Sequence, residues 1–449
     1  PKTILFDDYS TDELVAIGEV AIDRFAADGV GLILAVDCGI GSVAEVAHAR
    51  ALGIEVVVCD HHMIGSVLPD ATIVHPALGG YPDPYLCASA AAHKLASVFT
   101  TLAAGGAETL DDDLALVALA TVCDVVPLRG ENRSLVDQLK VSASNLGFTL
   151  GPRINAAGRL HSADPAVELM LTSSERRAAE LASELAGAND RRREIEREIL
   201  LEAEAQASHQ RDQFAIVVAG ESWHPGVLGI IAGRLADRYN RPAIALSIDG
   251  ATAAGSGRAG GRFDLHGGLS ACAELLVRYG GHRAAAGLEL DVVRLGAFRA
   301  MFVQQAQRQL TLDDLRPSLR IDAVAAPEDV SLAAVDALEA IGPFGAENPE
   351  PKILLSGTEL VDVRKLGSSG QHFRLGVASQ GTRSQAVAFR QDRVISAVDL
   401  PRPVDLVVEL QRNEFNGREE AQAVVAALIE RDRPAAQERW KAAFLRGVN

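Results

Sequence analysis

Acidic residues follow three short apolar runs near the start of the chain. Asp7-Asp8, Asp37 and the Asp60-His61-His62 triplet each stand directly after such a run. Short apolar runs separated by helix-length stretches predict buried parallel strands, whose carboxyl ends meet at one edge of a sheet. Carboxylate oxygens together with imidazole nitrogens suit a divalent cation such as Mn²⁺ or Mg²⁺. The spacing therefore predicts a metal site along that edge.

Each of these residues also has an ordinary structural explanation. Asp60 could cap a loop beside two solvent-exposed histidines, and Asp37 could be the N-cap of a helix that begins at residues 39–42. Asp124, at the end of a helix predicted to run to about Cys123, could be a terminal residue without a role. We favour the metal site because it explains all three positions together.

A second group of candidate residues lies in glycine-rich segments farther along the chain. Paired glycines, as in Gly280-Gly281-His282, let a backbone approach a ligand closely, and the adjacent histidine can bind a phosphate. Ser256 and Arg258 lie in another glycine-rich stretch, 255–261, which we expect to be a loop of the same domain. An arginine so placed can hold a phosphate through two parallel hydrogen bonds. A Gly-Gly turn alone is more often structural, so the phosphate-binding interpretation depends on both segments.

A third candidate segment covers residues 152–159, which we expect to be a turn of small residues. Arg153 and Arg159 flank it, and two guanidinium groups so spaced suit a phosphodiester backbone. As a generic loop the segment would mean little.

The patterning of apolar residues predicts an α/β fold that is divided into five parts. Strands alternate with helices in residues 1–172, and a long charged helix at 173–212 connects them to a second α/β domain at 213–319. Several short strands, with a hairpin turn at Asn416-Gly417, predict a small β-barrel at 320–433. A tail helix is expected at 434–449.

The bulk composition limits the cellular context. At 449 residues the chain should hold two to four domains, and its apolar runs are too short to span a bilayer. Pro1 leads directly into a strand pattern, so we expect no signal peptide, and five widely spaced cysteines predict a reduced, cytoplasmic protein. A net charge of −17 argues against general adhesion to nucleic acid but allows a locally basic channel. We expect a monomer that does not bind membranes.

The chain resembles the DHH phosphoesterase superfamily and, within it, the RecJ-type single-stranded-DNA exonucleases. The segments that carry the resemblance occur in the family order along nearly the whole chain: VDCGI (36–40), CDHH (59–62), ATVCDVVPL (120–128), GPRINAAGR (151–159), WHPGVLGI (223–230), GGHRAAAG (280–287) and PFGAENPEP (343–351). The resemblance implies a parallel-sheet DHH domain, a long connecting helix, a second α/β domain of the DHHA1 type and a C-terminal OB-like β-barrel.

The resemblance also implies roles for individual residues. Asp37 would bridge two divalent cations, Mn²⁺ or Mg²⁺, while His61 and Asp124 would ligate one of them and His62 would contact the scissile phosphate. The residues implied in binding the DNA backbone or its 5′ end are Arg153, Asn155, Arg159, Ser256, Arg258, Gly281 and His282.

The chain departs from the family pattern at its first motif. Ser10 stands in place of the central acid and Glu13 in place of a glycine, whereas Asp8 and Asp12 keep positions that can ligate a cation. The loss of one carboxylate is expected to lower Mg²⁺ affinity. Spacing is also short between residues 8 and 22 and between 134 and 146, so we expect a trimmed protein or omitted segments there.

These observations predict a metal-dependent 5′→3′ exonuclease that hydrolyses single-stranded DNA to mononucleotides in DNA repair and recombination. Its expected partners are single-strand-binding protein and other repair proteins. Phe373, Phe389 and Phe415 are candidate platforms for bases on the barrel, although each is explained more simply as a core residue. The alternatives are a catalytically weakened scaffold that binds single strands or repair partners, and a phosphodiesterase of very short oligonucleotides.

Overall fold

The computed structural model describes residues 2–6, 11–104, 113–138, 143–366, 372–379, 381–389, 400–415 and 418–430. These residues form two compact units, one of residues 1–126 and 130–317, the other of residues 127–129 and 318–449. None of the described helices is long and apolar enough to cross a membrane. The tail helix expected at 434–449 lies outside the described residues.

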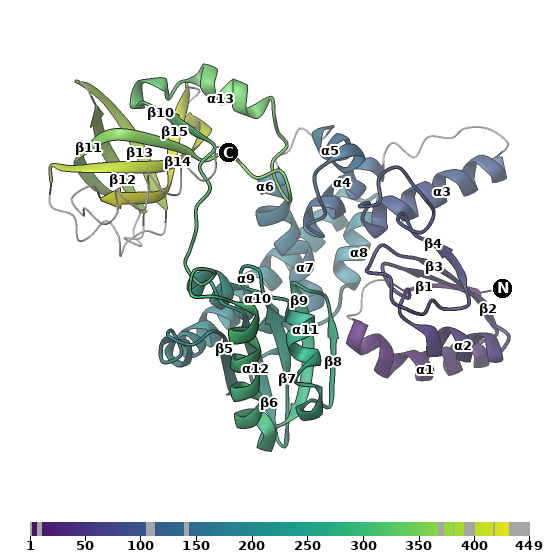
Figure 1. Cartoon of the computed structure of the whole chain (residues 1–449). Helices are drawn as coiled ribbons and strands as arrows, with labels where there is room; N and C mark the ends of the chain where they lie inside the picture. The colour runs from purple at the N-terminus through teal and green to yellow at the C-terminus, as the bar shows by residue number, and fades with distance from the viewer. Residues whose placement is uncertain are drawn as a thin grey trace. The chain divides into compact units, whose positions relative to one another are not determined.

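The N-terminal domain is built on a four-stranded parallel sheet, as the apolar runs predict (Figure 1). Its strands follow one another in chain order: β1 (Lys2–Phe6), β2 (Val30–Val36), β3 (Glu55–Cys59) and β4 (Thr72–Val74). Helices α1 (Thr11–Ala27) and α2 (Val43–Ala51) cover one face, where Phe25 and Val46 join Ile33 and Val58 in one core. Because the strands are parallel, Asp37 and Asp60 emerge at the same edge.

A group of helices follows this sheet: α3 (Ala88–Ala104), α4 (Leu114–Cys123), α5 (Gly130–Asp137), α6 (Ala143–Asn145), a π-helical turn (Leu146–Leu150), α7 (Gly151–Leu160) and α8 (Asp164–Leu171). The turn expected at 152–159 is therefore wrong, because these residues form α7. Pro152 occupies the first turn, where its missing N–H costs nothing, and Ala156 and Ala157 are buried. A Cβ on Gly151 would lie 2.5 Å from Sγ of Cys123, so α7 begins against the end of α4.

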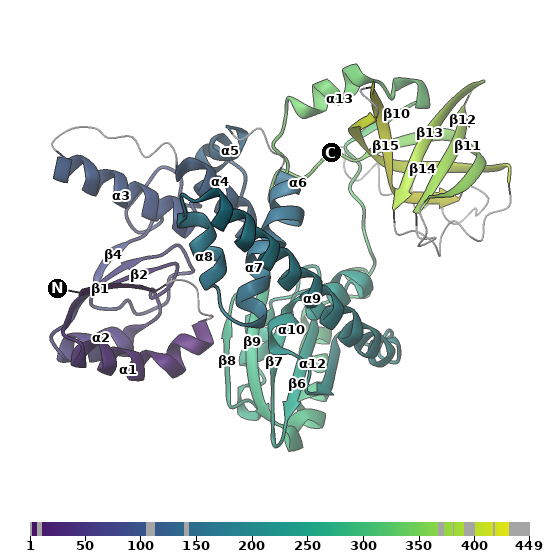
Figure 2. The same ribbon diagram turned by 180° about the vertical axis from the view of Figure 1, so that it is seen from behind.

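Helix α9 (Glu175–Ser208) is the long charged helix that the sequence predicts, with 34 residues (Figure 2). Leu185 packs with α7 and α8 near one end, and Ala203 and Ala207 pack with the second domain near the other. Between them, buried Arg192 contacts Asn189 and Glu196 on the same helix, and Glu196 also pairs with Arg234 of the second domain. The helix thus joins the two domains through buried contacts.

The second domain contains a five-stranded mixed sheet in the order β5-β6-β7-β9-β8. Its strands are β5 (Ile216–Glu221), β6 (Ala243–Asp249), β7 (Thr252–Arg258), β8 (Arg278–Gly281) and β9 (Ala285–Asp291). Helix α10 (Pro225–Tyr239) packs on one face, and α11 (Leu265–Ser270) and α12 (Leu295–Gln309) pack on the other. The loop expected at 255–261 is wrong in its first half, because Ser256 and Arg258 belong to β7, between β6 and β9.

The second compact unit, residues 127–129 and 318–449, is a ring of strands that closes through pairing of β11 with β14. Its elements are β10 (Ala323–Ala325), α13 (Leu332–Glu339), β11 (Ile353–Leu366), β12 (His372–Ser379), β13 (Thr382–Phe389), β14 (Arg402–Phe415) and β15 (Arg418–Glu430). Val335 of α13 packs into a core with the inward side chains of the strands. Strands β14 and β15 pair up to Phe415 and Arg418, whereas the predicted turn residues Asn416 and Gly417 lie outside the described residues.

Candidate metal centre and phosphate-binding wall

Asp37 stands at the carboxyl end of β2 in a backbone conformation that is rare for a residue with a side chain. Its φ is +63°, and its N–H donates to the carbonyl of Cys59 at 2.9 Å. Left-handed conformations of non-glycine residues cost free energy and gather at functional sites. Asp37 does not cap a helix, since the N-cap of α2 is Ser42.

Asp60 is 1% exposed and organises the loop that carries the two histidines. Its Oδ1 accepts from the backbone of His61 at 2.7 Å and from Nδ1 of His62 at 2.7 Å, and its Oδ2 accepts from the N–H of Ile40 at 3.0 Å. Burial opposes ionisation, but the hydrogen bonds from the His62 ring and from Ile40 outweigh it, so the pKa of Asp60 is lowered. A buried carboxylate therefore positions both histidines.

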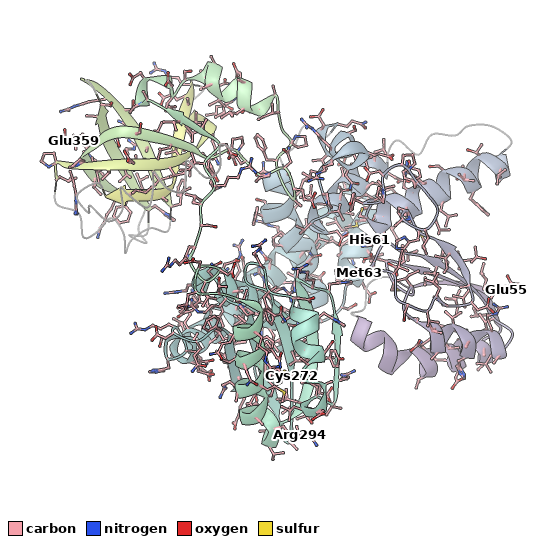
Figure 3. All side chains as sticks on the ribbon, in the orientation of Figure 1. Glu55, His61, Met63, Cys272, Arg294 and Glu359 are labelled. Carbon is pink, nitrogen blue, oxygen red and sulfur yellow. The ribbon has the colours of Figure 1, made fainter. Side chains whose placement is uncertain are left out.

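His61 faces two carboxylates. Its Nε2 lies 3.2 Å from Oδ1 of Asp37 and 3.2 Å from Oδ2 of Asp124. Nε2 of His61 and Oδ1 of Asp37 are buried, and neither makes a hydrogen bond of acceptable geometry within the described part of the chain. Burial lowers the pKa of His61, but the facing carboxylates outweigh burial and raise it. In Figure 3, His61 and Met63 are labelled next to each other, to the left of the N-terminal sheet.

These atoms pass a simple test for a divalent cation. One ligand atom from each of Asp37, His61 and His62 lies within 4.8 Å of the others, and Asp124 approaches the same nitrogen of His61. Two of the atoms are buried polar groups that lack a satisfactory partner, and a cation would provide one. The mixed oxygen and nitrogen donors suit Mn²⁺ or Mg²⁺.

Asp124 reaches this cluster from α4. It is the C-cap of that helix, and its N–H donates to the carbonyl of Ala120 at 2.9 Å. The next residue, Val125, has a φ of +58°, which is strained for a β-branched side chain. The backbone thus turns sharply where Asp124 meets His61.

His62 joins the N-terminal domain to the second domain. Its ring is stacked on that of His282, with 5.3 Å between the centroids and 7° between the planes. The hydrogen bond to Asp60 raises the pKa of His62 despite burial. Burial and the nearby His62 lower the pKa of His282. The GGH segment predicted from the sequence therefore lies against the DHH triplet.

His75 fixes the backbone of His62 and was not predicted from the sequence as a functional residue. It is 5% exposed, its Nδ1 accepts from the N–H of Ala77 at 3.2 Å, and its Nε2 lies 2.9 Å from the carbonyl oxygen of His62. Since Nδ1 accepts, Nε2 carries the proton and donates to His62. The only signal in the sequence was a histidine at the end of a short strand.

Ser256 and Arg258 are two positions apart on β7 and therefore lie on the same face of the sheet, which α10 covers. Ala253 lies on the other face, in the core with α11 and α12. On this face Ser256 is paired with Gly287 of β9, and Gly287 with Gly280 of β8. The small residues leave the face flat beside the partly buried Arg258. A Cβ on Gly229 of α10 would lie 2.8 Å from Nη2 of Arg258, so glycine makes room for the guanidinium.

Arg159 brings a second cation to Arg258. Burial, and then the charge of Arg159, lower the pKa of Arg258. Nη1 of Arg159 donates to the carbonyl of Gly226 at 3.3 Å, and a Cβ on Gly226 would lie 1.9 Å from the carbonyl oxygen of Arg159. An anion between the two arginines would relieve their repulsion.

The structure says less about the remaining candidate residues. Arg153 donates to the carbonyl of Thr149 one turn earlier, and Asn155 is exposed on α7, so their roles remain predictions. Gly281, with a φ of +128°, ends β8 directly before His282. Asp8 and Ser10 lie outside the described residues, and Asp12 lies in α1 with its side chain outside them.

Comparisons with known proteins agree with this architecture. Three family models match successive parts of the chain: the DHH family N-terminal domain at residues 5–121, the DHHA1 domain at 212–308 and the RecJ OB domain at 321–427. These matches define a three-domain protein of the DHH class, in which Asp37, His61 and His62 lie within the first match.

Whole-chain relatives narrow the class. The single-stranded-DNA-specific exonuclease RecJ of Bacillus subtilis (strain 168) is 34% identical, over 96% of this chain and 57% of that protein. The RecJ of Salmonella typhimurium (strain LT2) is 32% identical, over 90% of this chain and 78% of that protein. The chain belongs to the RecJ family, as its motifs predict. It spans about 57% of the length of the Bacillus relative.

Solved structures give the same result. The crystal structure of RecJ from Thermus thermophilus in complex with Mn²⁺ has a TM-score of 0.78 and 29% identity, over 94% of this chain and 66% of that chain. The Mg²⁺ complex of RecJ from the same organism has a TM-score of 0.74 and 27% identity, over 96% of this chain and 67% of that chain. The expected fold, with its third domain as a closed ring of strands, is confirmed.

Proposed function

We propose that this chain is a metal-dependent exonuclease that hydrolyses single-stranded DNA from the 5′ end. The observation that carries the proposal is the meeting of Asp37, His61 and Asp124 at one edge of a parallel sheet, with His282 of the second domain stacked on the adjacent His62. The RecJ relatives are named for this activity, and the Thermus structures contain Mn²⁺ or Mg²⁺.

The residues of the cluster have different proposed roles. Asp37, His61 and Asp124 hold the cations, to which the resemblance adds Asp8 and Asp12. Divalent cations held by these residues would polarise the phosphodiester and lower the pKa of the attacking water. Asp60 orients His62, whose ring would contact the scissile phosphate beside His282.

Arg258, Ser256 and Arg159 bind the 5′ end of the strand in this proposal. The support is that both guanidinium groups lie against α10, Arg159 at Gly226 and Arg258 at Gly229. A terminal phosphate carries more charge than an internal one, and a planar guanidinium matches its oxygens. The direction of hydrolysis would follow from this recognition of the end.

The ring of strands holds the single strand farther along. Phe389 is 48% exposed and contacts His372 on the neighbouring strand at 5.4 Å between ring centroids, an aromatic pair on which bases can stack. Phe373 is 3% exposed and belongs to the core, and the side chain of Phe415 lies outside the described residues. Of the three phenylalanines, Phe389 is thus the one we propose as a platform.

The cellular setting remains part of the proposal. By the resemblance we expect a cytoplasmic monomer that acts in repair and recombination together with single-strand-binding protein. The expectation of a reducing compartment is carried over from the spacing of the five cysteines.

A nuclease assay with Mn²⁺ and a 5′-phosphorylated oligonucleotide tests the activity. We expect mononucleotides to be released, and Asp37→Ala to lower the rate by at least about 100-fold, since even the partners of metal ligands contribute about 10- to 100-fold. Asp70→Ala is the matched control, because Asp70 is an exposed acid that pairs with Arg50. Comparison of rates on dinucleotides and long strands separates the proposal from a short-oligonucleotide phosphodiesterase.

The second candidate function is a scaffold that binds single strands without hydrolysis. It is favoured by Ser10, which stands where the family has an acid. If the chain binds single strands but does not hydrolyse them at any Mn²⁺ or Mg²⁺ concentration, the scaffold function is correct and the exonuclease function is wrong. A variant Ser10→Asp that gains activity would identify the missing carboxylate as the cause.

A further inference from the structure

Two exposed arginines lie next to His282 and have no part in the roles given above. Arg262 stands between β7 and α11, and Arg283 stands between β8 and β9, directly after His282. Nη2 of Arg283 donates to the carbonyl of Arg262 at 3.3 Å. The guanidinium of Arg283 therefore reaches the backbone of Arg262, and both residues are exposed.

The backbones of the two loops are tied together. The N–H of Ala259 donates to the carbonyl of Ala284 at 2.8 Å, and the N–H of Leu265 donates to the carbonyl of Arg283 at 3.0 Å. The N–H of His282 donates to the carbonyl of Ala285 at 2.7 Å, which closes the turn that carries Arg283. The arginines thus hold a fixed position relative to the stacked pair of His62 and His282.

The acids near these arginines have hydrogen-bond partners of their own, although the hydrogen bonds from Thr311, and then the charge of Arg262, lower the pKa of Asp314. Asp264 caps α11 by accepting from Gly267 at 2.9 Å, and Asp314 accepts from the N–H and the hydroxyl of Thr311 at 2.9 and 2.6 Å. Within the described part of the chain, neither Arg262 nor Arg283 forms an ion pair with a carboxylate. In a chain with a net charge of −17, two such cations side by side are a local exception.

We propose that Arg262 and Arg283 form a second phosphate subsite, which binds the backbone phosphate next to the one held at His62 and His282. The inference rests on the proposed function, because it assigns part of the path of the same single strand. The ligand is an internal phosphodiester, which carries one negative charge and is held through charge-assisted hydrogen bonds. Its role is to hold the strand as it advances after each cleavage.

The salt dependence of binding tests this subsite without requiring turnover. The full chain, freed of metal by a chelator, is titrated with a fluorescent single-stranded oligonucleotide over a range of NaCl concentrations. For single strands the slope of log K against log salt changes by about 0.7 for each phosphate that the protein no longer neutralises. The double variant R262Q/R283Q, which loses one phosphate contact, is expected to have a slope shallower by about 0.7.

The matched control is R211Q/R308Q, which removes the same charge from two exposed arginines of the same unit. Its slope is expected to equal that of the wild type. Equal slopes for R262Q/R283Q and the wild type, or equal losses in both double variants, would overturn the subsite. Melting temperatures show that the variants remain folded.

Activity separates this result from the proposed function. If the wild type shows no hydrolysis with Mn²⁺ but R262Q/R283Q still changes the slope, the exonuclease proposal fails and the subsite stands. If hydrolysis occurs and the slopes are equal, the subsite fails alone. In an active enzyme we also expect R262Q/R283Q to lower kcat/KM on a long strand more than on a dinucleotide.

Discussion

The imidazole of His282 lies parallel to that of His62, although 220 residues of sequence separate them. Gly281 makes this contact possible, because its φ is +128° and a Cβ there would lie 2.6 Å from the carbonyl oxygen of Ala285. Only glycine adopts this conformation without strain. A single turn between β8 and β9 thus delivers the ring of one domain to the loop of the other.

Arg258→Lys is expected to weaken recognition of the 5′ end. Lysine keeps the charge but loses the planar pair of donors that matches phosphate oxygens. We expect KM for a 5′-phosphorylated strand to rise by about tenfold, as the loss of one charge-assisted hydrogen bond predicts, while KM for a 5′-hydroxyl strand changes little. Steady-state kinetics on the two substrates measures this. Arg238→Lys, at an arginine of α10 that pairs with Glu204 of α9, is the control, and equal effects on both substrates would contradict the assignment.

His75→Ala is expected to lower kcat by about 10- to 100-fold with little change in KM, because the carbonyl of His62 loses its donor and the ring leaves its position. His75→Gln keeps a side-chain donor and should recover part of the rate. Steady-state kinetics together with thermal denaturation separates this effect from unfolding.

The control for His75 is His48→Ala, which removes a histidine of the same domain whose Nε2 contacts Asp23 at 2.7 Å on the surface. It should leave kcat unchanged. A His75→Ala variant with wild-type kcat would show that the hydrogen bond to His62 has no positioning role.

We expect Phe389→Ala to weaken single-strand binding and Phe373→Ala to lower stability. Phe389 is exposed, so its removal is expected to weaken single-strand binding by about 1–3 kcal/mol, the usual value of one stacked base, at little cost in stability. Phe373 is buried in the ring, so its removal should destabilise the fold by about 3–5 kcal/mol. Fluorescence binding and chemical denaturation measure the two effects, and unchanged binding in Phe389→Ala would remove it as a platform.

Glu350→Gln is expected to stabilise the second unit at neutral and alkaline pH. Burial, and then the nearby carboxylate of Glu409, raise the pKa of Glu350 above its ordinary value of 4.5. The ionised carboxylate therefore destabilises the folded state above its raised pKa, and this cost disappears as the pH falls below 4.5. Denaturant titration from about pH 8 to about pH 4 should show a gain that vanishes on acidification. Glu359→Gln, at an exposed position, should show no such trend.

The meeting of Asp37 with His61 could be predicted because its information is local. Asp37 and the triplet at Asp60 each follow a strand, and parallel strands bring their ends together. The role of Asp60 was hidden inside the triplet, because a carboxylate that ligates and one that positions its neighbours look alike in a sequence. The hydrogen bond of His75 to His62 spans 13 residues and depends on how β4 ends, which no local pattern reports.

Two segments of small residues that the sequence predicts as loops form regular elements. A Cβ on Gly255 would lie 2.0 Å from the carbonyl oxygen of Ala245, so β7 contains glycine because its neighbour approaches closely. In α7, Ala156 and Ala157 are small because the helix is packed on several sides. Glycine and alanine show no alternation of polarity, so periodicity cannot separate such elements from turns.

The contact of Gly226 with Arg159 ties α7 to the first turn of α10. A Cβ at position 226 would lie 1.9 Å from the carbonyl oxygen of Arg159, so the backbones of the two helices touch there and no side chain fits between them. Because Arg159 and Arg258 both lie against α10, we expect the two guanidinium groups to keep their mutual distance when a ligand binds.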